Sequence, residues 1–116
     1  MDDASAVARI VLTTADNPKE AAQLARTLVE ERLAACATLL PAAQSIYRWE
    51  GQIEQATETL LVLKTSPEKL VALETRLHQL HSYQTPEFLV LAVEAGSPGY
   101  LEWLQAALRE PWEAKP

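Results

Sequence analysis

The chain has 116 residues, of which 48% are hydrophobic, and its 16 acidic and 10 basic side chains give a net charge of −6. A single core of ordinary size accounts for this length, so we expect one domain over residues 1–116, with 1–6 as a flexible N-terminal segment and 110–116 as a C-terminal tail. The acidic balance and the lack of a Lys/Arg run argue against a nucleic-acid partner, and no apolar run of about 18 residues predicts a membrane span.

The compartment is predicted from the first residues and from the cysteine count. The opening stretch MDDASAVARIVLTT lacks the basic region and the apolar stretch of a signal peptide. Cys36 is the only cysteine, so no intrachain disulfide can form. Both observations favour a cytoplasmic location.

The first predicted elements are a strand and a helix. Residues 7–14, VARIVLTT, are rich in β-branched side chains and predict a buried strand. Asn17 is the expected N-cap of the following helix, with Pro18 in the first helical position and Glu20 as the acidic member of a capping box. Apolar residues at helical spacing extend this helix to about Leu33.

A long hairpin is predicted next, over residues 36–65. Its turn is WEGQ at 49–52, the strongest turn signal of the region. Pro41 cannot donate a hydrogen bond to a strand ladder, so we expect a bulge there, which splits the first arm into 35–40 and 43–49. The second arm covers 52–65.

The remaining pattern is a helix, a strand and a final helix. Ser66 and Pro67 predict the start of the second helix, whose apolar stripe consists of Leu70, Leu73, Leu77 and Leu80. Residues 87–94 predict a strand, and 100–110 predict a short C-terminal helix. The order βαββαβ followed by a helix indicates an α+β fold, a two-layer sandwich of the ferredoxin-like type.

The length of the hairpin predicts self-association. A 14-residue arm spans about 46 Å, whereas a 16-residue helix covers only about 24 Å. The helices are therefore too short to cover the far end of the hairpin, which carries Ile46, Tyr47, Trp49 and Ile53. Because these side chains and strand edges would otherwise meet water, we expect a closed homo-oligomer built through the hairpin.

Five stretches along the chain resemble the CutA divalent-ion-tolerance family. They are LAACATLLP at 33–41, SIYRWEGQIE at 45–54, LLVLKTS at 60–66, HSYQTPEFLVLAV at 81–93 and YLEWL at 100–104. The resemblance implies a ferredoxin-like subunit in a tight homotrimer with the architecture of PII signalling proteins. It also implies a role in copper and divalent-cation homeostasis.

HSYQTPEFLVL at 81–91 contains the candidate cation site. In an extended segment His81, Tyr83, Thr85 and Glu87 alternate onto one face. Imidazole and carboxylate suit Cu(II) or another divalent cation, and two ligands from one chain predict weak binding by His81 and Glu87. The alternative is structural, with His81 bonded to the carbonyls that end the second helix.

The family's other proposed ligand positions are not filled by metal-binding side chains in this chain. The resemblance places a cysteine at the end of the first strand and a histidine just before His81, where this sequence has Thr13 and Leu80. Loss of a thiolate and an imidazole argues against tight copper binding. Cys36 is expected to behave as a buried hydrophobic residue, and His78 to face solvent.

An intersubunit cleft is the expected location of the site. The residues predicted to line it are Tyr47, Trp49, Glu50, Lys64, Tyr83 and Thr85. Lys64 either extends to the surface or faces a carboxylate such as Glu87.

Three functional classes follow from these features. The first is a trimeric copper or divalent-cation tolerance protein, and the second is a PII-like signalling, small-ligand or partner-binding module in which cations are incidental. The third, an enzyme, is not expected, because the sequence has no nucleophile motif, P-loop or CxxC pair. The sequence does not identify a protein partner.

Overall fold

The computed structural model describes residues 1–109, and the predicted tail at 110–116 lies outside this range. Its elements in chain order are β1 (Asp2–Asp3), β2 (Arg9–Ala15), α1 (Pro18–Glu30), β3 (Cys36–Trp49), β4 (Gln52–Thr65), a 3-10 turn η1 (Pro67–Lys69), α2 (Leu70–Leu80), β5 (Leu89–Ala92), β6 (Ala95–Gly96) and α3 (Pro98–Leu108). None of the helices in residues 1–109 is long and apolar enough to cross a membrane.

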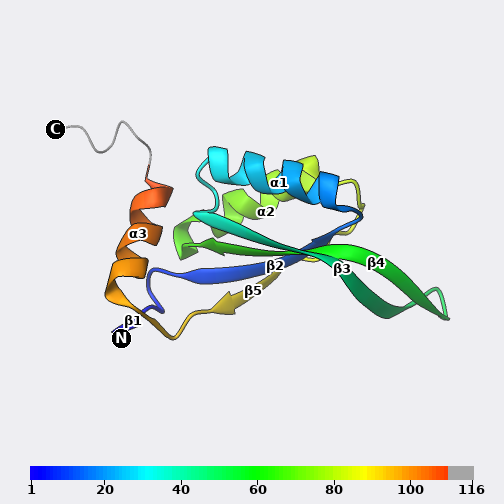
Figure 1. Ribbon diagram of the computed structural model, residues 1–116, viewed down its shortest axis with the longest axis horizontal. Coiled ribbons are helices and arrows are strands. Elements are labelled where there is room, and N and C mark those ends of the chain that lie inside the picture. Colours follow the sequence, from blue (N-terminus) through cyan, green and yellow to red (C-terminus); the bar gives the residue numbers. More distant parts are fainter. Residues whose placement is uncertain (110–116) are drawn as a thin grey trace.

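The main sheet has four antiparallel strands in the order β3-β4-β2-β5. Helices α1 and α2 lie side by side on one face of it, and α3 lies at the end opposite the hairpin turn (Figure 1). The molecule is elongated, 55 × 29 × 22 Å, because the β3–β4 hairpin extends far beyond the helices. The α+β class and the ferredoxin-like order are confirmed.

The core lies between the helices and one face of the sheet. Alternate residues of β2 and β4 face the helices, which bury their side chains completely. The buried cluster consists of Val11, Ala15, Ala21, Leu24, Ala25, Leu28, Ala34, Leu61, Leu63, Leu73 and Leu77. Within residues 1–109, α1 and α2 both lie on that face and leave the opposite face of the sheet open.

The N-cap of α1 is as predicted, but Glu20 accepts the Asp16 N–H rather than that of Asn17, and the helix ends earlier than expected. The Asn17 side chain accepts the Glu20 N–H at 2.9 Å. The helix ends at Glu30 rather than at Leu33, because Arg32 takes a left-handed conformation with φ of 60°. The N–H of Leu33 then donates back to the carbonyl of Leu28 and closes the helix. Since this cap lacks the usual glycine, the sequence contains no clear stop signal.

The hairpin follows the prediction closely. The β3–β4 register shifts between Leu40 and Ala43, so the bulge expected at Pro41 is present. At the turn, Glu50 and Gly51 both have positive φ, 50° and 76°. A two-residue turn of this kind matches the twist of the strands it joins.

β5 is shorter than the strand expected over 87–94, and it covers only Leu89–Ala92. Its pairing with β2 stops where Leu89 meets Leu12, and the carbonyl of Thr14 beyond that point accepts a bond from His81 instead. Glu87 therefore lies outside the strand. β5 was expected to continue the core, but Leu89, Val90 and Leu91 are exposed in this chain. Leu89 and Leu91 pair with Leu12 and Ile10 on the open face, and β5 is an edge strand.

The N-terminal segment 1–6, expected to be flexible, contributes to regular structure. Asp2–Asp3 pairs with Ala95–Gly96, and the side chain of Ala4 is fully buried. Ala4 belongs to a second, smaller cluster beneath α3. The final helix also begins earlier than predicted, at Pro98.

Candidate functional site

His81 lies directly after α2 and is buried, with 9% of its surface exposed. Its backbone N–H donates to the Leu77 carbonyl at 2.9 Å and closes the helix. Its ring Nε2 lies 2.7 Å from the Thr14 carbonyl oxygen, and its Nδ1 accepts the Tyr83 N–H at 3.0 Å. Because Nδ1 accepts a hydrogen bond, the ring proton lies on Nε2, which donates to Thr14. Both ring nitrogens are therefore in use.

The ring contacts differ from the structural alternative that the sequence suggested. That alternative had the imidazole bonded to the last carbonyls of α2. The ring reaches instead to the end of β2, and only the backbone of His81 bonds to the helix.

Tyr83 connects the same loop to β4. Its hydroxyl donates to Glu58 Oε2 at 2.7 Å, and its ring lies 4.7 Å from that of His81. Burial raises the pKa of the Tyr83 phenol well above its usual value, and the hydrogen bond to Glu58 and the negative charge of that carboxylate raise it further. Tyr83 is thus a hydrogen-bond donor at neutral pH.

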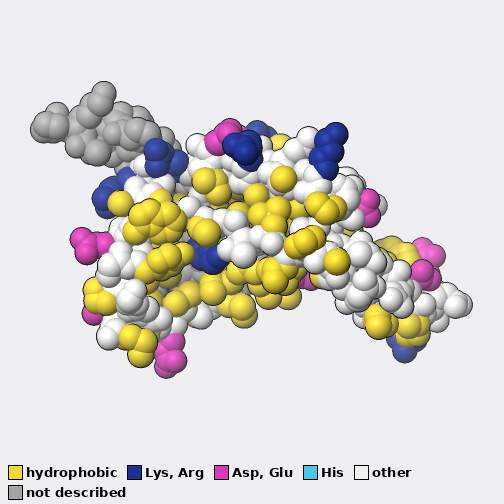
Figure 2. Space-filling view, in the orientation of Figure 1, with side chains coloured by type: hydrophobic (Ala, Val, Ile, Leu, Met, Phe, Trp, Pro, Cys, Tyr) yellow, Lys and Arg dark blue, Asp and Glu magenta, His cyan; other side chains and the backbone are white. Residues whose placement is uncertain are grey.

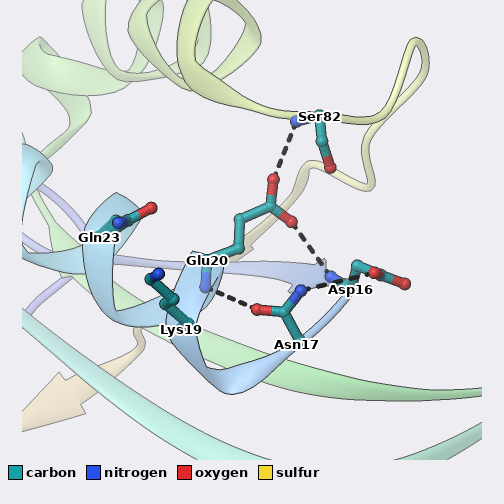
Figure 3. Close-up of a pocket in the computed structure, with 6 residues that line it drawn as sticks. All are labelled: Asp16, Asn17, Lys19, Glu20, Gln23 and Ser82. Atoms are coloured by element: carbon teal, nitrogen blue, oxygen red, sulfur yellow. Dashed lines mark hydrogen bonds between the residues drawn. The ribbon is translucent and has the colours of Figure 1, made fainter.

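Glu20 holds the loop from the side of α1. Figure 3 shows its carboxylate between Asp16 and Ser82, where it accepts the two backbone N–H groups at 3.2 and 3.1 Å. Burial raises the pKa of Glu20, but the hydrogen bonds from Ser82 and Asp16 outweigh it and hold the pKa below its ordinary value of 4.5. The carboxylate borders an open pocket of about 320 Å³.

We call this set of contacts the His81 junction. It consists of Thr14, Glu20, Glu58, His81, Ser82 and Tyr83. It lies where β2 ends and the sheet narrows to the two strands of the hairpin, since Ala15, the last residue of β2, pairs with Thr59.

Thr85 and Glu87 do not share a face with His81 as the extended pattern predicted. Residues 82–85 form bends, and Thr85 and Glu87 are exposed while His81 is buried. Glu87 makes no hydrogen bond or ion pair with any other residue of 1–109. Its carboxylate oxygens are therefore available to a cation.

The residues present in one subunit do not fit a tight copper site. Within residues 1–109, no three His, Cys, Asp or Glu side chains lie close enough to hold a metal ion. Thr13, at the family's cysteine position, is fully buried, and its hydroxyl has no partner within the described residues. Leu80 packs against the core. The metal role of His81 and Glu87 stays a prediction.

Lys64 does not pair with Glu87. Its ammonium donates to the Thr38 hydroxyl and lies 3.7 Å from Cys36 Sγ. Cys36 is half-buried beside this charge, rather than enclosed among apolar side chains. Lys64 lies on the face of the sheet away from the helices, because its neighbours Leu63 and Thr65 are buried on the other face.

The hairpin-tip residues lie apart from the His81 junction in one subunit. Tyr47 is four residues beyond Ala43, the register partner of Glu58, which corresponds to about 13 Å along the strand. Tyr47, Trp49 and Glu50 are all exposed. Within one subunit the residues predicted to line the cleft therefore form two separate groups.

Comparisons with known proteins identify the family. Residues 9–107 match the family described as CutA1 divalent ion tolerance protein. The chain belongs to this family. The "Divalent-cation tolerance protein CutA" of Pectobacterium atrosepticum is 49% identical over 100 residues, which cover 86% of this chain and 91% of that protein.

Solved structures agree with this assignment. The crystal structure of CutA from Xylella fastidiosa is 40% identical, has a TM-score of 0.86, and is matched over 88% of this chain and 98% of its own. The CutA1-type fold is therefore shared over nearly the whole described chain.

The predicted cytoplasmic location is wrong. A structure from Archaeoglobus fulgidus is described as the periplasmic divalent cation tolerance protein CutA; it is 33% identical, with a TM-score of 0.85 and coverage of 88% of this chain and 99% of its own. The prediction depended on the opening residues and on the single cysteine. A lone cysteine forms no intrachain disulfide in any compartment, so its number carries no information on location.

Sequence reasoning missed Thr14, Glu58, Ser82 and the second role of Glu20. Glu20 was recognised only as a capping residue. Its spacing from Asn17 reveals that role, whereas its bond to Ser82 spans 62 positions and has no local signal. Glu58 lies in an alternating strand, and only the tertiary fold brings Tyr83 to it.

Proposed function

We propose that the protein is a homotrimer that binds divalent cations, Cu(II) or another ion, weakly in clefts between its subunits. The observation that carries the assembly is the apolar face of the sheet, which no helix in residues 1–109 covers. In β2 and β4 its side chains alternate with the fully buried ones, and in β5 they are exposed. They include Ile10, Leu12, Leu60, Val62, Leu89 and Leu91.

Figure 2 shows hydrophobic side chains gathered on the side of the sheet away from the helices and again at the hairpin end. Isolated exposed apolar residues are normal, but a contiguous field of them marks an interaction surface. At the hairpin end Ile46, Trp49 and Ile53 are 69%, 61% and 64% exposed. A neighbouring copy that packs on the open face with its own hairpin covers both regions at once.

Cation binding is supported by the family and by the chemistry of Glu87. The relatives are named for divalent-cation tolerance. An exposed carboxylate without a protein partner is an oxygen ligand, and a site made of such groups without a thiolate binds divalent cations weakly and with little selectivity. We place Glu87 at the mouth of the cleft, with Tyr83, Thr85 and Lys64 along it and Tyr47, Trp49 and Glu50 supplied through the hairpin.

The test combines particle mass with calorimetric titration. Light scattering is expected to give three times the subunit mass, and Cu(II), Zn(II) and Mg(II) are titrated into the wild type, Glu87→Gln and Glu94→Gln. Glu94 is also an exposed carboxylate, so it controls for loss of surface charge. Glu87→Gln should weaken binding at least tenfold and Glu94→Gln less than twofold.

Two outcomes contradict the proposal. A monomer mass would show that there is no intersubunit cleft. Equal cation affinity in the two variants would show that Glu87 is not a ligand. Thermal stabilisation by a metabolite without any response to cations favours the PII-like ligand-binding module instead.

A further inference from the structure

We infer that His81 is a structural clasp that ties the loop after α2 to the end of β2, and that it does not ligate cations in the folded protein. The inference rests on the two hydrogen bonds of its ring, at 2.7 and 3.0 Å, and on its burial. It goes beyond the proposed cation binding and does not depend on it.

The ring has no nitrogen to offer a metal ion. Coordination uses a bare nitrogen lone pair, and the one bare nitrogen, Nδ1, already receives the Tyr83 N–H. A cation at Nδ1 would displace that donor. A cation at Nε2 would require the proton to move to Nδ1, where it would meet the Tyr83 N–H, and would leave the Thr14 carbonyl without its partner.

The sheet needs a donor at the position that His81 fills. β5 pairs with β2 only as far as Leu12, so no residue of β5 reaches the carbonyl of Thr14. A carbonyl that is partly shielded from water at the end of a strand loses stability without a hydrogen-bond partner. The His81 ring supplies that partner, and its Nδ1 then fixes the backbone of Tyr83.

The other contacts of the His81 junction depend on the same loop geometry. Ser82 donates to Glu20 of α1, and the Tyr83 hydroxyl donates to Glu58 of β4. Residues 81–83 thus join α2 to α1, β2 and β4. A clasp of this kind explains why a histidine is buried here although no carboxylate of residues 1–109 accepts a bond from its ring.

His78 provides the contrast within the same helix. It is exposed, and Nδ1 is the only one of its ring nitrogens with a partner in residues 1–109, the Glu74 carbonyl of its own helix. It connects no second element. If either histidine responds to added metal, the inference requires that it be His78.

The first test is NMR of ring nitrogens in the wild-type protein labelled with ¹⁵N-histidine. His81 should show one unprotonated nitrogen at Nδ1 and one protonated nitrogen at Nε2, and both signals should stay in place when Zn(II), a diamagnetic probe, is added. A ring that exchanges between tautomers, or a His81 signal that shifts with Zn(II), overturns the inference. This measurement needs no variant to fold.

The second test compares His81→Ala with His78→Ala. His81→Ala should lower the melting temperature and speed amide exchange of Ser82 and Tyr83, while its Cu(II) dissociation constant stays within twofold of the wild type. His78→Ala should leave melting and exchange unchanged. A tenfold weaker Cu(II) affinity in His81→Ala alone would overturn the inference. If the wild type binds no cation, the proposed function fails, whereas melting, exchange and the NMR tautomer still decide the role of His81.

Discussion

The two halves of the β3–β4 hairpin have the same strand structure but very different surroundings. In the half of β4 that pairs with β2, Thr59, Leu61, Leu63 and Thr65 are buried beneath the helices. In the outer half, residues 52–57 are exposed or only partly covered on both faces. Strand formation therefore does not require a core on either side along its whole length. The inner half is stabilised within the chain, and the outer half is the part that we assign to contacts between copies.

The boundary between the halves is fastened by polar contacts. The β3 bulge, the last residue of β2 and the His81 junction all meet near Glu58 and Thr59. Packing alone does not hold this boundary, because the apolar core ends there. The hydrogen bonds of the loop at 81–83 stabilise the boundary instead of apolar packing. They fix the point where the four-stranded sheet becomes a two-stranded ribbon.

The largest expected effect, loss of the trimer, comes from substitutions in the outer half of the hairpin. Tyr47→Asp or Trp49→Ala should convert the trimer to monomer or aggregate, because a buried unpaired charge or a lost aromatic anchor at the centre of a contact is costly. Light scattering and melting temperature measure the change.

The control for this substitution is Val71→Asp. Val71 is 80% exposed on α2, away from the hairpin, so a charge there should leave the trimer intact. Unchanged mass and melting temperature in both hairpin variants would show that the outer half is not the contact.

In the separated subunit, truncation of a side chain should destabilise the protein far more in the inner half of the hairpin than in the outer half. Leu61 is completely buried, and Leu61→Ala should lower the free energy of unfolding by about 2–5 kcal/mol. Ile53→Ala, at the exposed end of the same strand, should change it by less than about 0.5 kcal/mol. Urea unfolding of both variants in the Tyr47→Asp background gives the comparison. Equal losses would mean that the outer half also packs within its own chain.

Local chemistry in the sequence predicted most of the fold. Asn17 caps α1, Pro41 marks the bulge, and Gly51 sits in the turn, because each of these effects depends on near neighbours. The helix end at Arg32 was not predictable in this way, since a non-glycine residue in a left-handed conformation is stabilised by its surroundings.

The candidate site was less predictable than the fold. Strict alternation put His81 and Glu87 on one face, but that pattern assumes an extended chain, and residues 82–85 bend. Which ring nitrogen of His81 carries the proton depends on the hydrogen bond to Thr14, 67 positions away. No periodicity in the sequence encodes such a contact.

A gain of stability is expected from removing an unpaired hydroxyl from the core between the sheet and the helices. The hydroxyl oxygens of Thr13 and Thr59 are buried without a partner in residues 1–109. Thr13→Val keeps the shape and removes the unpaired group, so it should raise the free energy of unfolding by about 1 kcal/mol.

Thr65→Val is the matched control in the same sheet. The Thr65 hydroxyl is buried but donates to the Leu33 carbonyl at 2.7 Å, so the same substitution should lower the free energy of unfolding by about 1 kcal/mol. Thermal melting measures both changes. If Thr13→Val destabilises the protein as Thr65→Val does, the Thr13 hydroxyl has a partner after all.

The smallest expected effect comes from removing the charge of Glu20, which tests the contacts at the boundary between the inner and outer halves of the hairpin. Its pKa in the folded protein is below its ordinary value of 4.5, because Ser82 and Asp16 donate hydrogen bonds to the ionised form. A lowered pKa means that the stabilisation is fully present above about pH 4.5 and is lost as the pH falls through the folded value. Since the carboxylate is partly exposed, Glu20→Gln should lower the free energy of unfolding by less than about 1 kcal/mol at neutral pH. That difference from the wild type should shrink to nothing in acid. Glu74→Gln, at an exposed position of α2, is the control for loss of a surface carboxylate. Urea unfolding across this range provides the measurement, and a difference for Glu20→Gln that persists at the lowest pH would mean that the bonds to Ser82 and Asp16 do not depend on the charge.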